Sequence, residues 1–262
     1  MTIKVGVFGA AGRMGAEVCR AVYNDPELEL VAAVDPQHGG LDLRQVTGLD
    51  TALAIHASPD ALARSGAQVA VDFTSFEASL ANMAWCAANG VHAVVGTTGF
   101  TSEDYDRITA EFVSSNCLIA PNFAIGAVLM MHFAALAAPW FESGEIIELH
   151  HDRKLDAPSG TALMTAARMA EASDGWAPDP TRTEVLEGAR GGVGAADIHI
   201  HSVRLRGMVA HQEVILGTTG QSLTIRHDSY DRSSFMPGVV LAVKQVGERP
   251  GLTLGLDALL DL

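Results

Sequence analysis

The sequence predicts an α/β protein that combines an N-terminal Rossmann-like, doubly wound parallel sheet with a second α+β domain built on a mainly antiparallel sheet. The first part of this prediction rests on the alternation of apolar strand-like runs with helical segments through the first half of the chain. The second part rests on strand-like runs at residues 198–205, 211–216 and 222–227, which follow one another at hairpin-like spacing.

Length and composition limit what the chain can be. Its 262 residues are comfortable for two domains, and 48% hydrophobic residues are enough for a sizeable core. The formal net charge of -14 would repel nucleic acid overall, so we expect no nucleic-acid partner. Cys19, Cys86 and Cys117 are widely spaced without a CxxC pair, and no signal peptide is visible. Both features favour a cytoplasmic protein without disulfides or structural zinc.

The N-terminus carries the pattern of a dinucleotide site. A strand over residues 3–8 runs into a GxxGxxG turn at residues 9–15, and a helix and a second strand then lead to Asp35. Glycines allow a tight turn and close approach of the backbone to a pyrophosphate, and the acid lies at the distance needed to accept ribose hydroxyls. A purely structural tight turn is the alternative. Pro36 cannot bind a 2′-phosphate, which favours NADH, whereas Arg13 inside the turn leaves NADPH open.

Strands and helices continue to alternate up to residue 122. Polar turns follow two later strands, where the carboxyl ends of a parallel sheet bind ligands. Thr97, Thr98 and Asn122 can hydrogen-bond a ribose or a carboxamide, and Phe123 can border a nicotinamide; ordinary turn chemistry is the alternative. In chain order, we expect a strand over 28–34, an irregular stretch over 36–58 with a strand near 52–56, a strand over 69–73, a helix from Ser75 to residue 88, a strand over 91–95, a helix over 102–114 and a strand over 117–120.

Residues 123–141 form the most apolar stretch of the chain, interrupted by His132. Its length approaches what a helix needs to cross a bilayer. It also contains Gly126 and Pro139 and lacks the flanking Lys or Arg that orient membrane spans. We therefore predict a buried helix and no membrane association, with a span as the alternative.

The densest group of reactive residue types lies between residues 145 and 161. A strand over 145–149 ends in two histidines, a short polar loop contains Lys154, and a helix follows with Pro158 in its first turn. A histidine at a strand end can exchange a proton near pH 7, and a lysine supplies a fixed cation. A helix N-terminus rich in Ser, Gly and Thr can bind an anion. The pattern fits a carboxylate substrate that is protonated during reaction; a plain polar loop is the alternative.

The C-terminal third supplies the remaining strands of both domains. After a loop over 176–196, His199 and His201 share one face of a strand, a geometry that metals use. No third ligand is obvious, so we predict no metal site. A helix over 233–246, broken near Pro237, leads to a strand over 251–256 that can join the first sheet. The predicted domains are a dinucleotide-binding domain over 1–122 plus 232–262 and a substrate domain over 123–231.

The motif in residues 148–161 carries a family resemblance. It reads E-x-H-H-x-x-K-x-D-x-P-S-G-T, and two further segments, VGTTGF at 95–100 and APNF at 120–123, match the same family, as does the glycine turn. On these residues the chain resembles the dihydrodipicolinate (4-hydroxy-tetrahydrodipicolinate) reductases of bacterial lysine and diaminopimelate biosynthesis, and the resemblance covers essentially the whole chain.

The resemblance implies roles for particular residues. His150 would be the proton donor, Lys154 the second catalytic residue, and the substrate would be a cyclic imine dicarboxylate reduced by NADH or NADPH. The substrate-binding residues would be His151, Ser159, Gly160 and Thr161. The cofactor-binding residues would be Gly9, Ala10, Ala11, Gly12, Arg13, Met14, Asp35, Gly96, Thr97, Thr98, Ala120, Pro121, Asn122 and Phe123. Members are typically homotetramers built through the sheet of the second domain. Some carry an Arg where this chain has Pro36, so we expect no strong preference for NADPH.

Two other functions are alternatives to this interpretation. A semialdehyde dehydrogenase of similar plan would need a cysteine nucleophile at a strand–helix junction, but Cys19 and Cys86 fall within predicted helices and Cys117 at a strand start. A dinucleotide-sensing module without catalysis would retain the glycine turn and have little need for His150 and Lys154 together.

Overall fold

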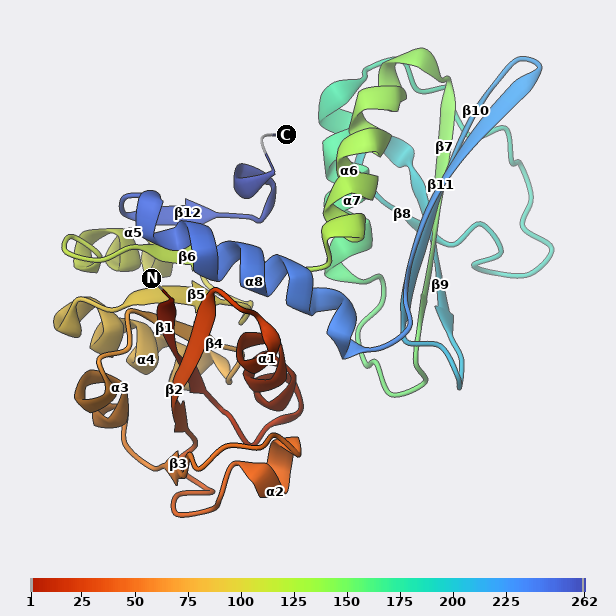
Figure 1. Cartoon of the computed structure of the whole chain (residues 1–262). Helices are drawn as coiled ribbons and strands as arrows, with labels where there is room; N and C mark the ends of the chain where they lie inside the picture. The colour runs from red at the N-terminus through yellow and green to blue at the C-terminus, as the bar shows by residue number, and fades with distance from the viewer. Residues whose placement is uncertain (1, 261) are drawn as a thin grey trace. The chain divides into compact units, whose positions relative to one another are not determined.

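The computed structural model describes residues 2–260 and 262, and the chain folds into two compact units. Unit 1 comprises Met1–Phe123 and Phe235–Leu262, and unit 2 comprises Ala124–Ser234. Each unit has its own sheet, as Figure 1 shows. The predicted fold class is confirmed.

Unit 1 is built on a seven-stranded sheet in the order β12-β6-β5-β4-β1-β2-β3. Every neighbouring pair is parallel. The central strands read as near-continuous apolar runs because both faces of the sheet are covered. The strands are β1 (Ile3–Phe8), β2 (Leu28–Val34), β3 (Ile55–His56), β4 (Val69–Asp72), β5 (His92–Val95), β6 (Cys117–Ile119) and β12 (Leu252–Leu254).

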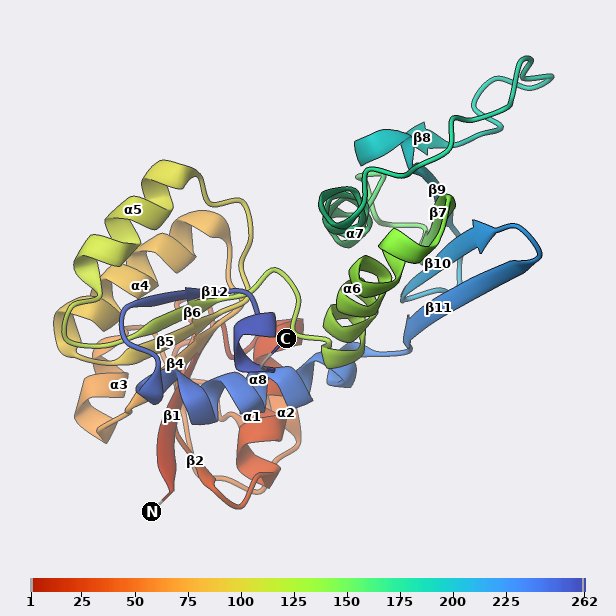
Figure 2. The same ribbon diagram turned by 90° about the horizontal axis from the view of Figure 1, so that it is seen from above.

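Helices cover the two faces of this sheet. In Figure 2, α3, α4 and α5 lie on one face, and α1 and α8 lie together on the other. The helices are α1 (Arg13–Asn24), α2 (Arg44–Thr47), α3 (Asp60–Ser65), α4 (Phe76–Asn89), α5 (Ser102–Glu111) and α8 (Met236–Gln245), with 3-10 turns η4 (Val246–Glu248) and η5 (Asp257–Leu259). In sheets of this kind, ligands generally bind at the carboxyl ends of the strands.

Unit 2 is built on a five-stranded sheet in the order β11-β10-β7-β9-β8, with α6 and α7 packed side by side. All neighbouring pairs are antiparallel except β7 and β9, which are parallel. The strands are β7 (Ser143–His150), β8 (Gly192–Val193), β9 (His199–Arg204), β10 (Ala210–Thr218) and β11 (Gln221–Ser229). The helices are α6 (Ile125–Ala137) and α7 (Gly160–Ala172), with 3-10 turns η1 (Ala138–Trp140), η2 (Ala195–Asp197) and, at the boundary between the units, η3 (Arg232–Phe235).

Several predicted details are wrong. Pro158 is not in the first turn of a helix, because Ser159 is the N-cap of α7 and Gly160 is its first residue. The helix predicted over 233–246 is a 3-10 turn over 232–235 followed by α8 from Met236, so the change lies next to Pro237, which occupies the first turn of α8, where proline is tolerated. The helix predicted over 102–114 ends at Glu111, and the short helices α2 and α3 are absent from the prediction.

The pairing of β9 has the greatest consequence. Its spacing from β10 suggests a hairpin, but β7 lies between these two strands in the sheet. β9 therefore runs parallel to β7, and Arg204 stands opposite His150 in the register.

The apolar stretch over 123–141 contains a helix of thirteen residues followed by a 3-10 turn. Within residues 2–260 and 262, no helix is both long enough and apolar enough to span a bilayer.

Candidate active site

The glycine turn of unit 1 depends on two of its glycines for its shape. Gly9 has a φ of 63°, a left-handed conformation that disfavours residues with a side chain. At Gly15 an added Cβ would lie 2.1 Å from the carbonyl oxygen of Gly9, so α1 can approach the turn closely only with glycine there. The N-terminus of α1 begins at Arg13 directly after the turn, which leaves its first N–H groups available to an anion.

A cavity of about 390 Å³ lies beside this turn, at the carboxyl ends of the central strands. Asp35 is nearly buried in its wall, where Oδ1 accepts the N–H of Gln37 at 3.1 Å and lies 3.0 Å from Nδ1 of His38. Asp72 holds two further lining residues in place, because it accepts hydrogen bonds from Thr74 and Asn82. The cavity brings the glycine turn and Asp35 together. Its lining residues are Phe8, Gly9, Val34, Asp35, Pro36, Gln37, Ala57, Pro59, Thr74, Ser75, Ala78 and Asn82.

The other predicted cofactor residues differ in what they present. Thr98 is exposed, whereas the hydroxyl of Thr97 donates to the carbonyl oxygen of Thr74 at 2.9 Å. The ring of Phe123 is buried and packs on Phe73, with ring centroids 5.4 Å apart. The Phe123 ring belongs to the core, and its place beside a nicotinamide stays a prediction. Gly96 also packs against Phe73, because an added Cβ would lie 2.0 Å from that ring.

In unit 2 the two strand residues Glu148 and His150 form a pair, in which Glu148 is buried and His150 is half-buried. They point to the same face of β7 because they are two residues apart. Glu148 is fully buried, and its Oε2 lies 2.5 Å from Nδ1 of His150. The imidazole is thus fixed through one ring nitrogen.

Arg204, at the end of β9, neutralises the Glu148 carboxylate. Its Nη1 donates to Oε2 of Glu148 at 2.9 Å and its Nη2 donates to Oε1 at 2.8 Å. Nη2 also donates to the carbonyl oxygen of Asp156 at 2.7 Å, which ties the loop after β7 to the sheet. This two-pronged geometry is the strong form of an ion pair between a guanidinium and a carboxylate.

These contacts set the protonation of the pair. Burial by itself raises the pKa of Glu148, but hydrogen bonds from Arg204, Ser202 and His150 outweigh it and hold that pKa below its ordinary value. Burial also lowers the pKa of His150, and the positive charges of Lys154 and Arg204 act in the same direction against the raising effect of Glu148. In the free protein Glu148 is therefore ionised and His150 is neutral at pH 7.

Lys154 lies in the loop between β7 and α7 and is not an isolated cation. Its Nζ donates to both carboxylate oxygens of Asp156, at 2.9 and 2.8 Å. The ammonium accordingly holds the pKa of Asp156 below its ordinary value. Nearby, Nδ1 of His151 accepts the N–H of Arg153 at 3.2 Å, which leaves Nε2 of His151 to carry the proton of the neutral ring.

The N-terminus of α7 completes the site. The hydroxyl of Ser159 accepts the N–H of Ala162 at 3.2 Å, while the N–H of Ser159 donates to Oε1 of Glu148 at the same distance. Gly160 opens the helix, so its N–H has no intrahelical acceptor. The structure thus gathers His150, the Ser159 cap and the start of α7 around one buried carboxylate.

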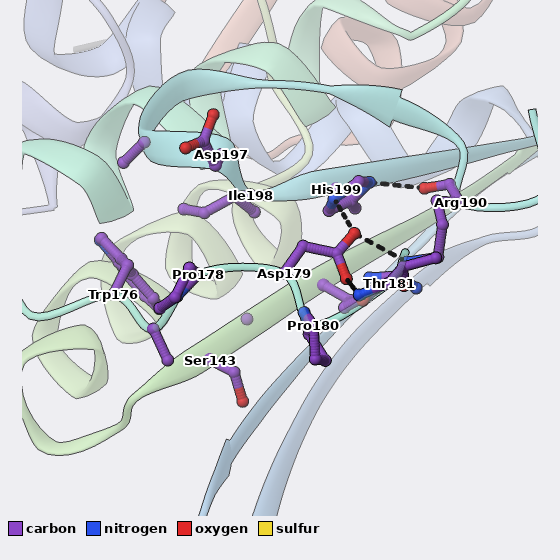
Figure 3. Close-up of a pocket in the computed structure, with 14 residues that line it drawn as sticks. Ser143, Trp176, Pro178, Asp179, Pro180, Thr181, Arg190, Asp197, Ile198 and His199 are labelled. Carbon is purple, nitrogen blue, oxygen red and sulfur yellow. Dashed lines mark hydrogen bonds and ion pairs between the residues drawn. The ribbon is translucent and has the colours of Figure 1, made fainter. Parts of the chain in front are cut away.

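A second polar cluster occupies a 550 Å³ cavity on the other face of β7 and β9 (Figure 3). His199 lies with Nδ1 2.6 Å from the carbonyl oxygen of Arg190 and Nε2 3.1 Å from Asp179. His201 and Arg190 both pair with Glu145. These histidines are occupied by ion pairs and hydrogen bonds, and no group of three His, Cys, Asp or Glu suited to a metal is found within the described ranges.

Two members of the site have no role in the sequence prediction. Glu148 lies in the motif of residues 148–161 and can be found from the sequence, because it is a carboxylate in an alternating strand, two residues before a histidine on the same face. Arg204 lies far along the chain, and only the parallel pairing of β7 with β9 brings it to the site.

Residues 3–123 match the family described as dihydrodipicolinate reductase, N-terminus, and residues 126–260 match dihydrodipicolinate reductase, C-terminus. The chain belongs to the dihydrodipicolinate reductase family. The resemblance drawn from the motif of residues 148–161 is confirmed.

Relatives and solved structures agree with this family. The 4-hydroxy-tetrahydrodipicolinate reductase of Cutibacterium acnes is 51% identical over 99% of both chains, and that of Nocardia farcinica is 50% identical over 100% of both. A dihydrodipicolinate reductase from Paenisporosarcina sp. TG-14, solved with dipicolinate bound, is 42% identical and covers 98% of this chain and 99% of its own, with a TM-score of 0.86.

The semialdehyde dehydrogenases, considered above as an alternative, share only the fold with this chain. An aspartate semialdehyde dehydrogenase II from Vibrio cholerae is 13% identical, covers 95% of this chain and 99% of its own, and has a TM-score of 0.57. All three cysteines of the present chain are buried, and burial raises the pKa of each thiol. None is placed to act as an acylated nucleophile.

Proposed function

We propose that this chain reduces 4-hydroxy-tetrahydrodipicolinate (dihydrodipicolinate) to tetrahydrodipicolinate with NADH or NADPH, as a step of lysine and diaminopimelate biosynthesis. The observation that carries the proposal is the pairing of His150 with the buried Glu148 next to Lys154 and the N-terminus of α7, in a chain of this family. A histidine, an ammonium and a helix N-terminus together suit a substrate that has two carboxylates and accepts a proton.

The cavity beside the glycine turn fits the adenosine end of a dinucleotide. Asp35 would accept ribose hydroxyls there, the Gly9–Met14 segment would hold the pyrophosphate, and the segments 96–98 and 120–123 would hold the nicotinamide end, Phe123 through its backbone. A bound nicotinamide would supply the hydride. Because Pro36 offers no cation and Asp35 is an anion, we expect NADH to be used at least as well as NADPH, with the exposed Arg13 available to a 2′-phosphate.

Proton delivery falls to His150. The free protein holds His150 neutral, and a substrate with two carboxylates brings negative charge that raises the pKa of its imidazole on binding. The imidazolium then gives its proton to the ring carbon next to the reduced position. Lys154 and the first turn of α7, with Gly160 and Thr161, would bind the carboxylates, and His151 would contact the substrate.

The assembly and the compartment follow the same family expectation. We propose a cytoplasmic homotetramer formed through the sheet of unit 2, in which β11 is a nine-residue edge strand, exposed along most of its length. An exposed edge strand offers its backbone for pairing with another copy. Light scattering with size-exclusion chromatography measures the mass directly, and a stable monomer at micromolar concentration would contradict the tetramer.

Parallel assays of NADH and NADPH oxidation test the activity. The substrate is generated in situ by a synthase that condenses pyruvate with aspartate semialdehyde, and oxidation must depend on that synthase. His150→Gln should lower kcat by about 10²–10⁴-fold while leaving NADH binding unchanged. Protein that binds NADH and oxidises neither dinucleotide would instead favour the dinucleotide-sensing module or another dehydrogenase.

A further inference from the structure

We propose that Glu148 is the positioning residue of the proton donor. It holds the imidazole of His150 with the proton on Nδ1 and so makes Nε2 the atom that exchanges a proton with the substrate. This inference rests on the proposed role of His150 and adds a residue to that site whose substitution acts through another side chain.

The neighbours of Glu148 require it to be ionised. Its two oxygens face the two terminal nitrogens of Arg204, the N–H of Ser159 and Nδ1 of His150. The guanidinium and the backbone N–H can only donate, so a protonated carboxyl could give its hydrogen to Nδ1 of His150 alone, and it would lose the negative charge that pairs with Arg204 through two hydrogen bonds. An ionised carboxylate accepts from all of them and has enough lone pairs to do so.

An ionised Glu148 leaves His150 with a single neutral form. Nδ1 must carry a hydrogen, because a carboxylate cannot donate to a bare ring nitrogen. Nε2 then holds the lone pair in the neutral ring and the second proton in the imidazolium. Within residues 2–260 and 262, Nε2 has no hydrogen-bond partner, so it is the ring atom open to a ligand. This is the logic of an acid that orients the histidine of a catalytic triad.

Arg204 allows Glu148 to orient the imidazole of His150 without strongly raising its pKa. An unpaired carboxylate 2.5 Å from an imidazole would raise its pKa strongly, but two hydrogen bonds from Arg204 neutralise this one. The charged groups around His150 are Glu148, Lys154 and Arg204, of which two are positive. Glu148 can therefore fix the ring without keeping it protonated in the absence of substrate.

The Glu148→Gln variant reverses the direction of the hydrogen bond. The amide oxygen of the new side chain would turn toward Arg204 and Ser159, because those groups only donate, and its NH₂ would then face His150. Nδ1 would have to accept, so the neutral ring would carry its proton on Nε2 and the imidazolium would lack an acceptor for its Nδ1–H. We expect kcat to fall by about 10²–10⁴-fold with a small change in KM, comparable with reversing the tautomer in a serine protease triad.

Nitrogen NMR of ¹⁵N-histidine-labelled protein tests the tautomer without relying on activity. The His150 signal is assigned by its loss in His150→Gln, and the tautomer is determined above the pH at which the ring titrates. We expect Nδ1–H in the wild type and Nε2–H in Glu148→Gln. A matched control is Glu145→Gln, which removes a carboxylate that pairs with His201 on the other face of the same strand and should change neither kcat nor the His150 signal.

The outcomes distinguish a failure of this inference from a failure of the proposed function. An Nε2–H tautomer in the wild type overturns the positioning role, whatever the activity of the variants, and this measurement holds even where Glu148→Gln fails to fold. A tautomer that switches in Glu148→Gln with unchanged kcat would instead remove His150 from proton transfer. Glu148→Asp keeps an ionised acceptor and should restore Nδ1–H and part of kcat; failure to do so while Glu145→Gln stays normal also counts against the inference.

Discussion

The buried ion pair between Glu148 and Arg204 allows a large and specific effect on stability to be predicted. Arg204→Met leaves a carboxylate of zero exposure without the two hydrogen bonds, at 2.9 and 2.8 Å, that compensate its charge. Removing one partner of a buried pair costs about 3–5 kcal/mol, because the remaining charge stays desolvated. We expect the free energy of unfolding of unit 2 at pH 7 to fall by this amount.

Urea denaturation at fixed protein concentration measures this loss. Trp176, which packs at Gly144 of β7, reports on unit 2 through its fluorescence. With a urea dependence of about 1–3 kcal/mol per molar, the unfolding midpoint should fall by at least about 1 M. Arg226→Met is the matched control: Arg226 pairs with Glu213 and Asp228, but its side chain is 44% exposed, so its loss should cost no more than about 1 kcal/mol.

The pH dependence and a double variant test the cause. The folded-state pKa of Glu148 is lowered, so the pair contributes stability that is present above the unfolded pKa of about 4.3 and is lost as pH falls through the folded pKa. Without Arg204, burial raises that pKa, so the deficit of Arg204→Met should shrink as pH falls toward 5. Adding Glu148→Gln should recover part of the loss at pH 7. An Arg204→Met deficit no larger than that of Arg226→Met, or one that Glu148→Gln deepens, would refute this reasoning.

Three further predictions address other features. His150 must be protonated to act, and its pKa lies below 6.5 in the free protein, so kcat/KM should fall as pH rises through a value below 6.5. The parameter kcat reports on the substrate complex and should fall at a higher pH. If kcat/KM and kcat fell at the same pH, the prediction would be contradicted. Gly15→Ala should destabilise unit 1 by about 1–3 kcal/mol and weaken NADH binding measured by fluorescence, more than Gly12→Ala, whose Cβ would lie 3.1 Å rather than 2.1 Å from the Gly9 oxygen. Burial raises the pKa of the Cys19 thiol to about 12, and the other two cysteines are also buried. A thiol reagent at pH 8 should therefore modify the native protein slowly and leave NADH oxidation intact, but should label three thiols in urea. Rapid inactivation would instead support a mechanism that uses a cysteine.

The sequence predicts the fold class and most elements because hydrophobic periodicity is a local signal. The strands that become β1, β2, β4 and β5 are short apolar runs bounded by glycine or polar turns, and each lies within a residue or two of its predicted place. α2 and α3 are too short for periodicity to distinguish them from turns. The pairing of β9 with β7 is a tertiary choice, and chain spacing alone favours the wrong neighbour, β10.

The same distinction applies to the candidate site. The motif in residues 148–161 brings His150, Lys154 and Ser159 into one short segment, so the local sequence is enough to find them. The cavity beside Gly9 and Asp35 lies at the carboxyl ends of the strands, where the alternation of strands and helices predicts a ligand site. Chain order cannot show that Lys154 is held by Asp156 or that the ring of Phe123 turns into the core, because both depend on side-chain packing.

The bond between Arg204 and Glu148 spans 56 positions of the chain, and this separation matters for how relatives of this protein are recognised. A search that scans for the segment 148–161 would accept a gene product in which Arg204 has been replaced. Such a chain would keep every residue of the segment, but its buried carboxylate would lack its counter-ion. The segment alone would identify it as a reductase, although the protein would be destabilised. Conversely, grafting the segment onto a foreign scaffold would transfer the histidine and leave behind the strand that holds it in working form. Screening of homologues or designs for this activity should therefore treat the guanidinium on β9 as part of the signature.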